Sequence, residues 1–218
     1  MAVRVALWDL PTRVVHWALV LLVPFSWWSA EQGHMDWHRT SGAILLGLIV
    51  FRLIWGVVGS STALFAGFVR GPRAVIAYAR GQGAPGLGHN PLGGWSVVAM
   101  IVLLVAQVSL GLFAVDTDGL ESGPLSHLVS FDTGRTAAEL HELNFKLLQG
   151  VIALHIATVL FYLIVRRDNL IAPMIGGAKP VDTAPATAPT MAPLGRALVV
   201  ATIAAGLAGW VSRGLPLP

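Results

Sequence analysis

Residues 140–155, LHELNFKLLQGVIALH, place two histidines 14 positions apart in a mostly apolar segment. An α-helix turns about 100° per residue, so 14 residues end about 40° short of four full turns. His141 and His155 are therefore expected on one face of a single helix, with a rise of about 21 Å between them. That separation excludes one metal ion for both residues and predicts one ligand near each surface of a membrane.

The composition of the chain is that of an integral membrane protein. Of its 218 residues, 55% are hydrophobic and 11% are charged, whereas about 25% of the residues in an ordinary soluble domain are charged. Apolar blocks about as long as a bilayer requires predict four spanning helices and a shorter fifth. These blocks are 14–30, 40–59, 95–115, 147–165 and 197–211. The fourth helix is expected to begin before its apolar block, near Ala137.

Several classes of protein are excluded by what the chain lacks. It contains no cysteine, which excludes disulfides, cysteine-ligated iron–sulfur clusters and covalently attached c-type haem. Any metal must then be held by histidine or carboxylate. The net charge is +3, but the basic residues are scattered between apolar blocks and form no stripe, so no nucleic-acid partner is expected.

The charges between the helices predict the orientation. The loop between the second and third helices carries Arg70, Arg73 and Arg80 and no acid, whereas residues 116–142 carry six acids and one arginine. Positively charged loops face the cytoplasm, so we expect a cytoplasmic N-terminus and an acidic outer face. The first span lacks a small-residue cleavage site, and we expect it to remain in the mature protein.

Two connecting segments have a distinctive composition. Residues 72–81 are predicted to form a short amphipathic helix at the cytoplasmic interface, with an ordinary loop as the alternative. Residues 177–195 are rich in alanine, threonine and proline. We interpret them as a flexible, partly extended linker without chemistry, followed by the fifth helix over 196–218.

Four of the seven histidines pair by depth. His16 lies on the cytoplasmic side of the first helix and matches His155, and His38 lies at the outer start of the second helix and matches His141. Imidazole in hydrocarbon is costly unless it is paired or ligates something. Two stacked His–His pairs predict two six-coordinate haem b groups. Zinc or copper is the weaker alternative, because only two ligands meet at each level.

Two basic residues inside the predicted spans fit the same interpretation. Arg52 follows His38 by 14 residues, which puts it at the depth of His16 and His155, where a haem propionate is a natural counter-ion. Lys146 is interpreted as a partner of an outer-haem propionate, as part of a quinone pocket, or as a side chain that snorkels to the surface. Small residues on the ligand helices would admit a flat macrocycle or close helix packing. They are Ser41, Gly42, Gly47 and Gly150.

These segments resemble the bacterial cytochrome b561 family, which includes the b-type cytochrome subunits of nickel-iron hydrogenases. Similar helices occur in the membrane subunit of formate dehydrogenase. The resemblance covers residues 5–176 and rests on short motifs around the ligand histidines and after the fourth helix. They are TRVVHW (12–17), DWHRTSG (36–42), LHELNF (140–145), Leu154-His155, RDNL (167–170) and Pro173-Met174.

The resemblance implies an all-α, four-helix di-haem domain over residues 1–176 in the bacterial inner membrane. It would pass electrons between the quinone pool, as ubiquinone or menaquinone, and a periplasmic cytochrome c, a hydrogenase or another redox subunit, in either direction. His16 and His155 would hold the inner haem, and His38 and His141 the outer one. The basic residues expected near propionates or the quinone headgroup are Arg13, Arg52, Arg73 and Arg167.

Two other functions stay open at this point. A superoxide oxidase would need positive charge at the outer haem edge, which Arg39 and Lys146 would have to supply against acidic loops. A haem-free membrane anchor would leave the paired histidines unexplained. His34, His89 and His127 are interpreted either as interfacial residues or as proton-exchange groups at a quinone or donor site.

Overall fold

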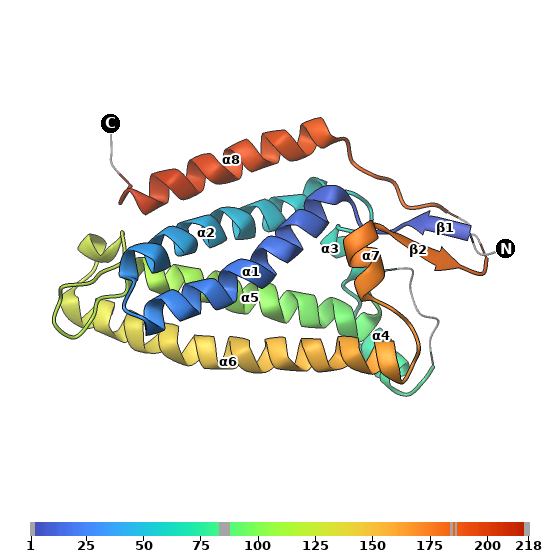
Figure 1. Ribbon diagram of the computed structural model, residues 1–218, viewed down its shortest axis with the longest axis horizontal. Coiled ribbons are helices and arrows are strands. Elements are labelled where there is room, and N and C mark those ends of the chain that lie inside the picture. Colours follow the sequence, from blue (N-terminus) through green and yellow to red (C-terminus); the bar gives the residue numbers. More distant parts are fainter. Residues whose placement is uncertain (1–2, 83–87, 184, 186, 216–218) are drawn as a thin grey trace. The chain divides into compact units, whose positions relative to one another are not determined.

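The computed structural model describes residues 3–82, 88–183, 185 and 187–215. It is 69% helical, and five helices in the described part are long and apolar enough to cross a membrane. They are α1 (Leu10–Glu31), α2 (Met35–Val58), α5 (Pro91–Phe113), α6 (Phe131–Ile164) and α8 (Leu194–Ser212) (Figure 1). The five apolar blocks are thus confirmed as helices, and the chain is a multi-pass membrane protein.

The start of α6 differs from the prediction. Its apolar part begins near residue 147, but the helix begins at Phe131, before the predicted start near Ala137. The turns before residue 147 carry ion pairs at helical spacing, Arg135 with Glu139 at 3.8 Å and Lys146 with Glu142 at 2.7 Å. Such pairs stabilise an exposed helix without an apolar face, so hydropathy alone does not find these turns.

The chain divides into two compact units. The first comprises residues 1–14, 53–100 and 151–198, and the second comprises residues 15–52, 101–150 and 199–218. Each unit is described separately. The first holds the arginine-rich segments, and the second holds the acidic loop that follows α5.

In the first unit, a pair of short antiparallel strands joins the N-terminal segment to the beginning of the linker. β1 (Val3–Ala6) pairs with β2 (Ala178–Val181). The carbonyl of Gly177 accepts the N–H groups of Leu7 at 2.7 Å and Trp8 at 3.0 Å. Gly177 has φ +82°, and a Cβ there would lie 3.0 Å from the Trp8 carbonyl oxygen, so this joint requires glycine.

Asp9 fixes the start of α1 in the same unit. Its carboxylate accepts the N–H of Thr12 at 2.8 Å, as an N-cap does, and the indole N–H of Trp55 at 2.9 Å. Burial alone would raise the pKa of Asp9, but hydrogen bonds from Ser60, Thr12 and Trp55 outweigh it and hold the pKa below its ordinary value of 3.8. A buried carboxylate is therefore retained as the anchor between α1 and α2.

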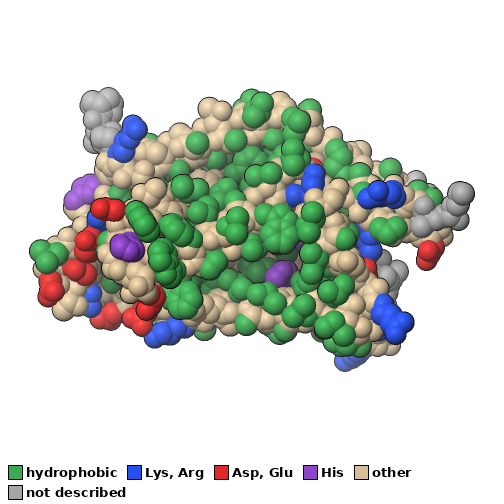
Figure 2. All heavy atoms as spheres, in the orientation of Figure 1, with side chains coloured by type: hydrophobic (Ala, Val, Ile, Leu, Met, Phe, Trp, Pro, Cys, Tyr) green, Lys and Arg blue, Asp and Glu red, His purple; other side chains and the backbone are tan. Residues whose placement is uncertain are grey.

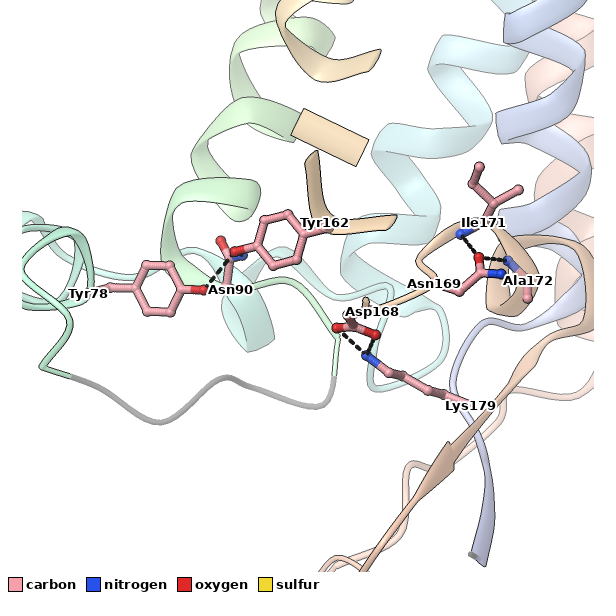
Figure 3. Close-up of polar contacts among 8 residues, drawn as sticks. All are labelled: Tyr78, Asn90, Tyr162, Asp168, Asn169, Ile171, Ala172 and Lys179. Atoms are coloured by element: carbon pink, nitrogen blue, oxygen red, sulfur yellow. Dashed lines mark hydrogen bonds and ion pairs between the residues drawn. The ribbon is translucent and has the colours of Figure 1, made fainter. Parts of the chain in front are cut away.

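The predicted helix over residues 72–81 is confirmed as α4 (Pro72–Ala79), with proline in its first turn. Tyr78 joins it to the end of α6, where the Tyr78 and Tyr162 hydroxyl oxygens lie 2.9 Å apart (Figure 3). Asn90 donates to the same Tyr162 oxygen at 3.0 Å. Burial and the hydrogen bond from Tyr162 raise the pKa of Tyr78 to about 12.

The chain turns sharply after α6. Arg167 adopts a left-handed conformation with φ +54°, and Asp168 then pairs with Lys179 of β2 at 2.7 Å (Figure 3). The side chain of Asn169 accepts the N–H groups of Ile171 and Ala172 and so begins α7 (Ile171–Gly176). Side-chain caps of this kind replace hydrogen bonds that the first turn of a helix lacks.

The linker is more ordered than its composition suggests. Besides β2, its later part is held against the turn that follows α2. The N–H of Ser61 donates to the Thr190 carbonyl at 3.0 Å, and the N–H of Thr190 donates to the Ser61 hydroxyl at 3.0 Å. The N–H of Ala192 donates to the Ser60 hydroxyl at 2.9 Å. A short helix, α3 (Phe65–Phe68), follows this turn.

In the second unit, α8 packs on α2 through small residues. Val200, Ala204 and Ala208 recur every four residues and are buried, so they form one face of α8. A Cβ at Gly47 would lie 3.5 Å from the Cβ of Ala208. Of its two predicted uses, Gly47 therefore serves close helix packing.

The acidic loop after α5 is also structured. Val115 and Ser122 form an isolated antiparallel bridge, and the 3-10 helix η1 (Ser126–Leu128) follows. The guanidinium of Arg39 on α2 pairs with Glu121 of this loop and with Asp36 at 2.8 Å. These ion pairs tie the loop to the first turns of α2.

Candidate metal centre

Two of the predicted ligands meet in the second unit. His38, in the first turns of α2, and His141, in the third turn of α6, have ring centroids 6.1 Å apart and ring planes 85° apart. Both side chains are half-buried. The structure brings these two side chains together, and their role as metal ligands stays a prediction.

Each imidazole is oriented through its Nδ1 atom. Nδ1 of His38 lies 2.8 Å from the Ser26 carbonyl oxygen, and Nδ1 of His141 lies 2.8 Å from the Gln107 carbonyl oxygen. A carbonyl oxygen only accepts, so each Nδ1 carries the proton and each Nε2 keeps its lone pair. Histidines that ligate metals are typically held in this way by their second nitrogen.

The spacing of the two rings fits the binding of one metal ion by both imidazoles. A metal–nitrogen bond of about 2 Å, with about 1 Å from nitrogen to ring centre, puts two ligating rings about 6 Å apart across one ion. Within the described ranges, no group of three or more His, Asp or Glu side chains suits a metal ion. Two imidazoles alone do not make a tetrahedral zinc site, but they fit the donor set that would hold a haem iron.

Glycine leaves room for this arrangement. A Cβ at Gly111 of α5 would lie 2.9 Å from Cε1 and 3.2 Å from Nδ1 of His141, so a larger residue would displace the ring. A Cβ at Gly42 or Gly150 would meet no atom within 4 Å. Open space therefore lies beside Gly42 on α2 and Gly150 on α6.

The side-chain amides of Asn144 and Gln107 form a pair next to His141. Asn144 is 9% exposed, and its Nδ2 donates to Oε1 of Gln107 at 2.6 Å and to the Leu103 carbonyl at 3.0 Å. Gln107 thereby holds Asn144 through its side chain and His141 through its backbone. Sequence reasoning missed both residues, although a glutamine inside an apolar span is itself a signal.

The inner pair stays a prediction from helical spacing. His16 belongs to the second unit and His155 to the first, and both are half-buried. Arg52 lies in the second unit and is 9% exposed. A guanidinium buried in a spanning helix is rare and marks a site for an anion or a polar partner.

The remaining basic candidates lie in varied surroundings. The guanidinium of Arg13 donates to the Ile175 carbonyl of α7, and Arg167 is the exposed residue that turns the chain after α6. Lys146 pairs with Glu142 on an exposed face of α6. Arg73 is exposed on α4.

The other three histidines have different surroundings from the His38–His141 pair. His34 packs against Trp37 and Trp28, with centroids 4.7 Å and 6.0 Å apart, in an exposed aromatic cluster typical of a membrane interface. His127 of η1 lies near Gly214. His89 packs between Trp8 and Phe68 in the first unit, with centroids 4.8 Å and 4.7 Å apart.

The surface around η1 and the first turns of α2 and α6 is acidic (Figure 2). Its carboxylates are those of Asp36, Asp118, Glu121, Asp132, Glu139 and Glu142, all exposed or half-buried. Two basic residues here, Arg39 and Lys146, are already paired with carboxylates. The electrostatic character of this surface is therefore negative.

Comparison with known proteins shows the family of the chain. A family model of prokaryotic cytochrome b561 matches residues 7–177, well over half of the 218 residues. No curated protein and no solved structure matches the chain. With five candidate membrane helices and a paired set of oriented imidazoles, the chain belongs to the prokaryotic cytochrome b561 family.

Proposed function

We propose that this protein is a di-haem cytochrome b of the bacterial inner membrane that carries electrons between a periplasmic redox partner and the quinone pool. Family membership implies b-type haem and electron transfer. The observation that carries the finer proposal is the His38–His141 pair, whose rings lie 6.1 Å apart with both Nδ1 atoms bound to carbonyls. His38 and His141 would hold a haem, which would supply one-electron redox chemistry when bound.

The residues of the chain supply ligation and orientation at the outer site. The carbonyls of Ser26 and Gln107 hold the two rings in the tautomer that leaves Nε2 free to bind iron. Gly111 keeps space for the His141 ring. Such second partners raise the basicity of the ligands and fix their planes.

The inner site is proposed for His16 and His155, with quinone close to it. The spacing of 14 residues that relates His141 to His155 also relates His38 to Arg52. Arg52 is therefore proposed to contact a propionate of the inner haem, and Arg13, Arg73 and Arg167 to lie toward propionates or the quinone headgroup. Lys146 is proposed to act at the outer haem or at a quinone pocket.

The charge of the outer surface favours a protein donor or acceptor over superoxide. Attraction of a small anion requires net positive potential at the haem edge. Arg39 and Lys146, the two residues that would supply it, are each paired with carboxylates. An acidic surface instead complements a basic redox protein such as a cytochrome c.

A quinone-dependent reoxidation experiment tests the proposal. The purified protein is reduced with dithionite without excess, and a short-chain ubiquinone or menaquinone analogue is added while the b-type absorbance is followed. We expect rapid reoxidation, and slower or incomplete reoxidation in His155→Ala. Reduced protein that no quinone reoxidises would contradict the quinone link. A colourless protein would support a haem-free anchor.

A second experiment tests superoxide as an electron donor to the protein. When it is generated enzymatically in the presence of the oxidised protein, we expect little haem reduction beyond a control that contains superoxide dismutase. Fast reduction that the dismutase abolishes would favour a superoxide oxidase instead.

A further inference from the structure

A cavity of about 430 Å³ lies in the first unit, and none of its lining residues is one of the four predicted haem ligands. Its walls come from the turn after α2, α3, the segment before α5 and the later part of the linker. The polar side chains that line it are Ser61, Thr62, Arg70, His89, Thr187 and Thr190. No acidic residue occurs among the lining residues that the structure describes.

The cavity presents hydrogen-bond donors and positive charge. Arg70 is exposed and forms no ion pair with a described carboxylate. His89 is held in the wall between the rings of Trp8 and Phe68. The Ser61 hydroxyl accepts the N–H of Thr190 at 3.0 Å and so keeps its own proton to donate. Arginine with clustered hydroxyl donors is the chemistry that recognises a phosphate group.

Hydrogen bonds within the protein hold the walls of the cavity in place. Ser61 and Thr190 exchange two hydrogen bonds at 3.0 Å, which hold the linker against the turn after α2. The Thr62 hydroxyl donates to the Leu7 carbonyl at 2.6 Å. A site that needs no ordering loses less entropy on binding. These hydrogen bonds hold this part of the linker in place, although its composition alone predicts a mobile segment.

The cavity lies at the depth of lipid headgroups. The indole N–H of Trp95 donates to the Arg70 carbonyl at 2.8 Å, and Trp95 is 44% exposed near the beginning of a spanning helix. Tryptophan in that position marks the membrane–water interface. The amphipathic α4 begins two residues after Arg70. Basic pockets at the cytoplasmic ends of spanning helices bind anionic headgroups.

We propose that this cavity binds a phosphate group, with Arg70 as its charged anchor and His89, Ser61 and Thr190 as hydrogen-bonding partners. The phosphate belongs either to the headgroup of an anionic phospholipid or to free inorganic phosphate. The proposal does not depend on the haem ligands or on quinone chemistry.

Ligand-induced thermal stabilisation of the full, haem-loaded chain in delipidated detergent tests the proposal. The probes are dioleoyl phosphatidylglycerol, dioleoyl phosphatidylcholine as the zwitterionic control, and inorganic phosphate. We expect a saturable rise in Tm of about 3–5 °C at tenfold above Kd. A rise with phosphatidylglycerol alone assigns the phosphate to a lipid, and a rise with inorganic phosphate assigns it to a free anion.

Two arginine variants locate the effect. In Arg70→Gln we expect binding of the active probe to weaken by at least about tenfold, with the haem content unchanged. Arg80→Gln, which removes an exposed arginine of the same loop that does not line the cavity, should bind like wild type. Equal binding by wild type and Arg70→Gln, or no stabilisation by either phosphate probe, would overturn the proposal. Loss of quinone reoxidation without loss of phosphate binding in Arg70→Gln would also contradict it.

Discussion

The position of the His141 ring is fixed by its neighbours on both sides. Nδ1 of His141 donates to the Gln107 carbonyl at 2.8 Å, and Gly111 leaves the space that the ring occupies. The ring centroid of His38 lies 6.1 Å from that of His141. Asn144 in turn fixes the Gln107 side chain at 2.6 Å. At this scale the site is a chain of contacts in which each residue restricts the next.

Gly111→Ala tests the space around the ring. The new Cβ would lie 2.9 Å from Cε1 of His141, and overpacking of this kind costs about 1–3 kcal/mol. We expect the variant to retain less haem at the outer site, as measured by pyridine haemochrome per protein. Gly206→Ala is the control, because a Cβ there meets nothing within 4 Å. Equal haem content in the two variants would contradict this role.

A double-mutant cycle tests the amide pair. Asn144→Leu leaves half-buried oxygens of Gln107 and Leu103 without their donor, at a cost of up to about 1–3 kcal/mol. Gln107→Leu together with Asn144→Leu removes both side-chain partners and should destabilise by less than the sum of the single variants. The free energies come from reversible unfolding in detergent. Strict additivity would show that the two amides do not interact.

At the scale of elements, the spanning helices were predictable and the connections less so. Apolar length identifies α1, α2, α5 and α8 because the bilayer sets a minimum length, but the first turns of α6 are polar and begin at Phe131. Predicted membrane depth matched His38 with His141, whose rings the structure brings together, although their role as ligands stays a prediction. It did not predict the carbonyl partners of Ser26 and Gln107, since every residue has a carbonyl and only tertiary structure selects one.

The hydroxyl pair that anchors α4 is testable by titration. Tyr78 and Tyr162 are the two tyrosines of the chain, so the ultraviolet tyrosinate signal reports on them alone. We expect Tyr78 to ionise with a pKa of about 12 in the wild type, and closer to its ordinary value of 10.0 in Tyr162→Phe. Because the folded pKa is the higher one, this contact stabilises fully below pH 10 and is lost as the pH rises through about 12. An unchanged titration in Tyr162→Phe would refute the contact.

At the scale of the whole molecule, charge sets the topology. The arginine-rich loop between α2 and α5 is predicted to face the cytoplasm, and the acidic loop between α5 and α6 the periplasm. The chain lacks cysteine, so single cysteines can be labelled without background. We expect Asp118→Cys to react with a membrane-impermeant maleimide in spheroplasts, and Arg80→Cys to react only after permeabilisation. The opposite pattern would reverse the orientation and place the acidic surface inside.

Haem stoichiometry tests the central claim most directly. Reduced-minus-oxidised spectra and pyridine haemochrome are measured on the wild type, His141→Ala, His155→Ala and, as the control, His34→Ala, each checked for monodispersity. The account predicts two haems b per chain in the wild type and the control, and one in each ligand variant, with different bands lost. A monodisperse wild type without haem, or ligand variants that keep both haems, would contradict it.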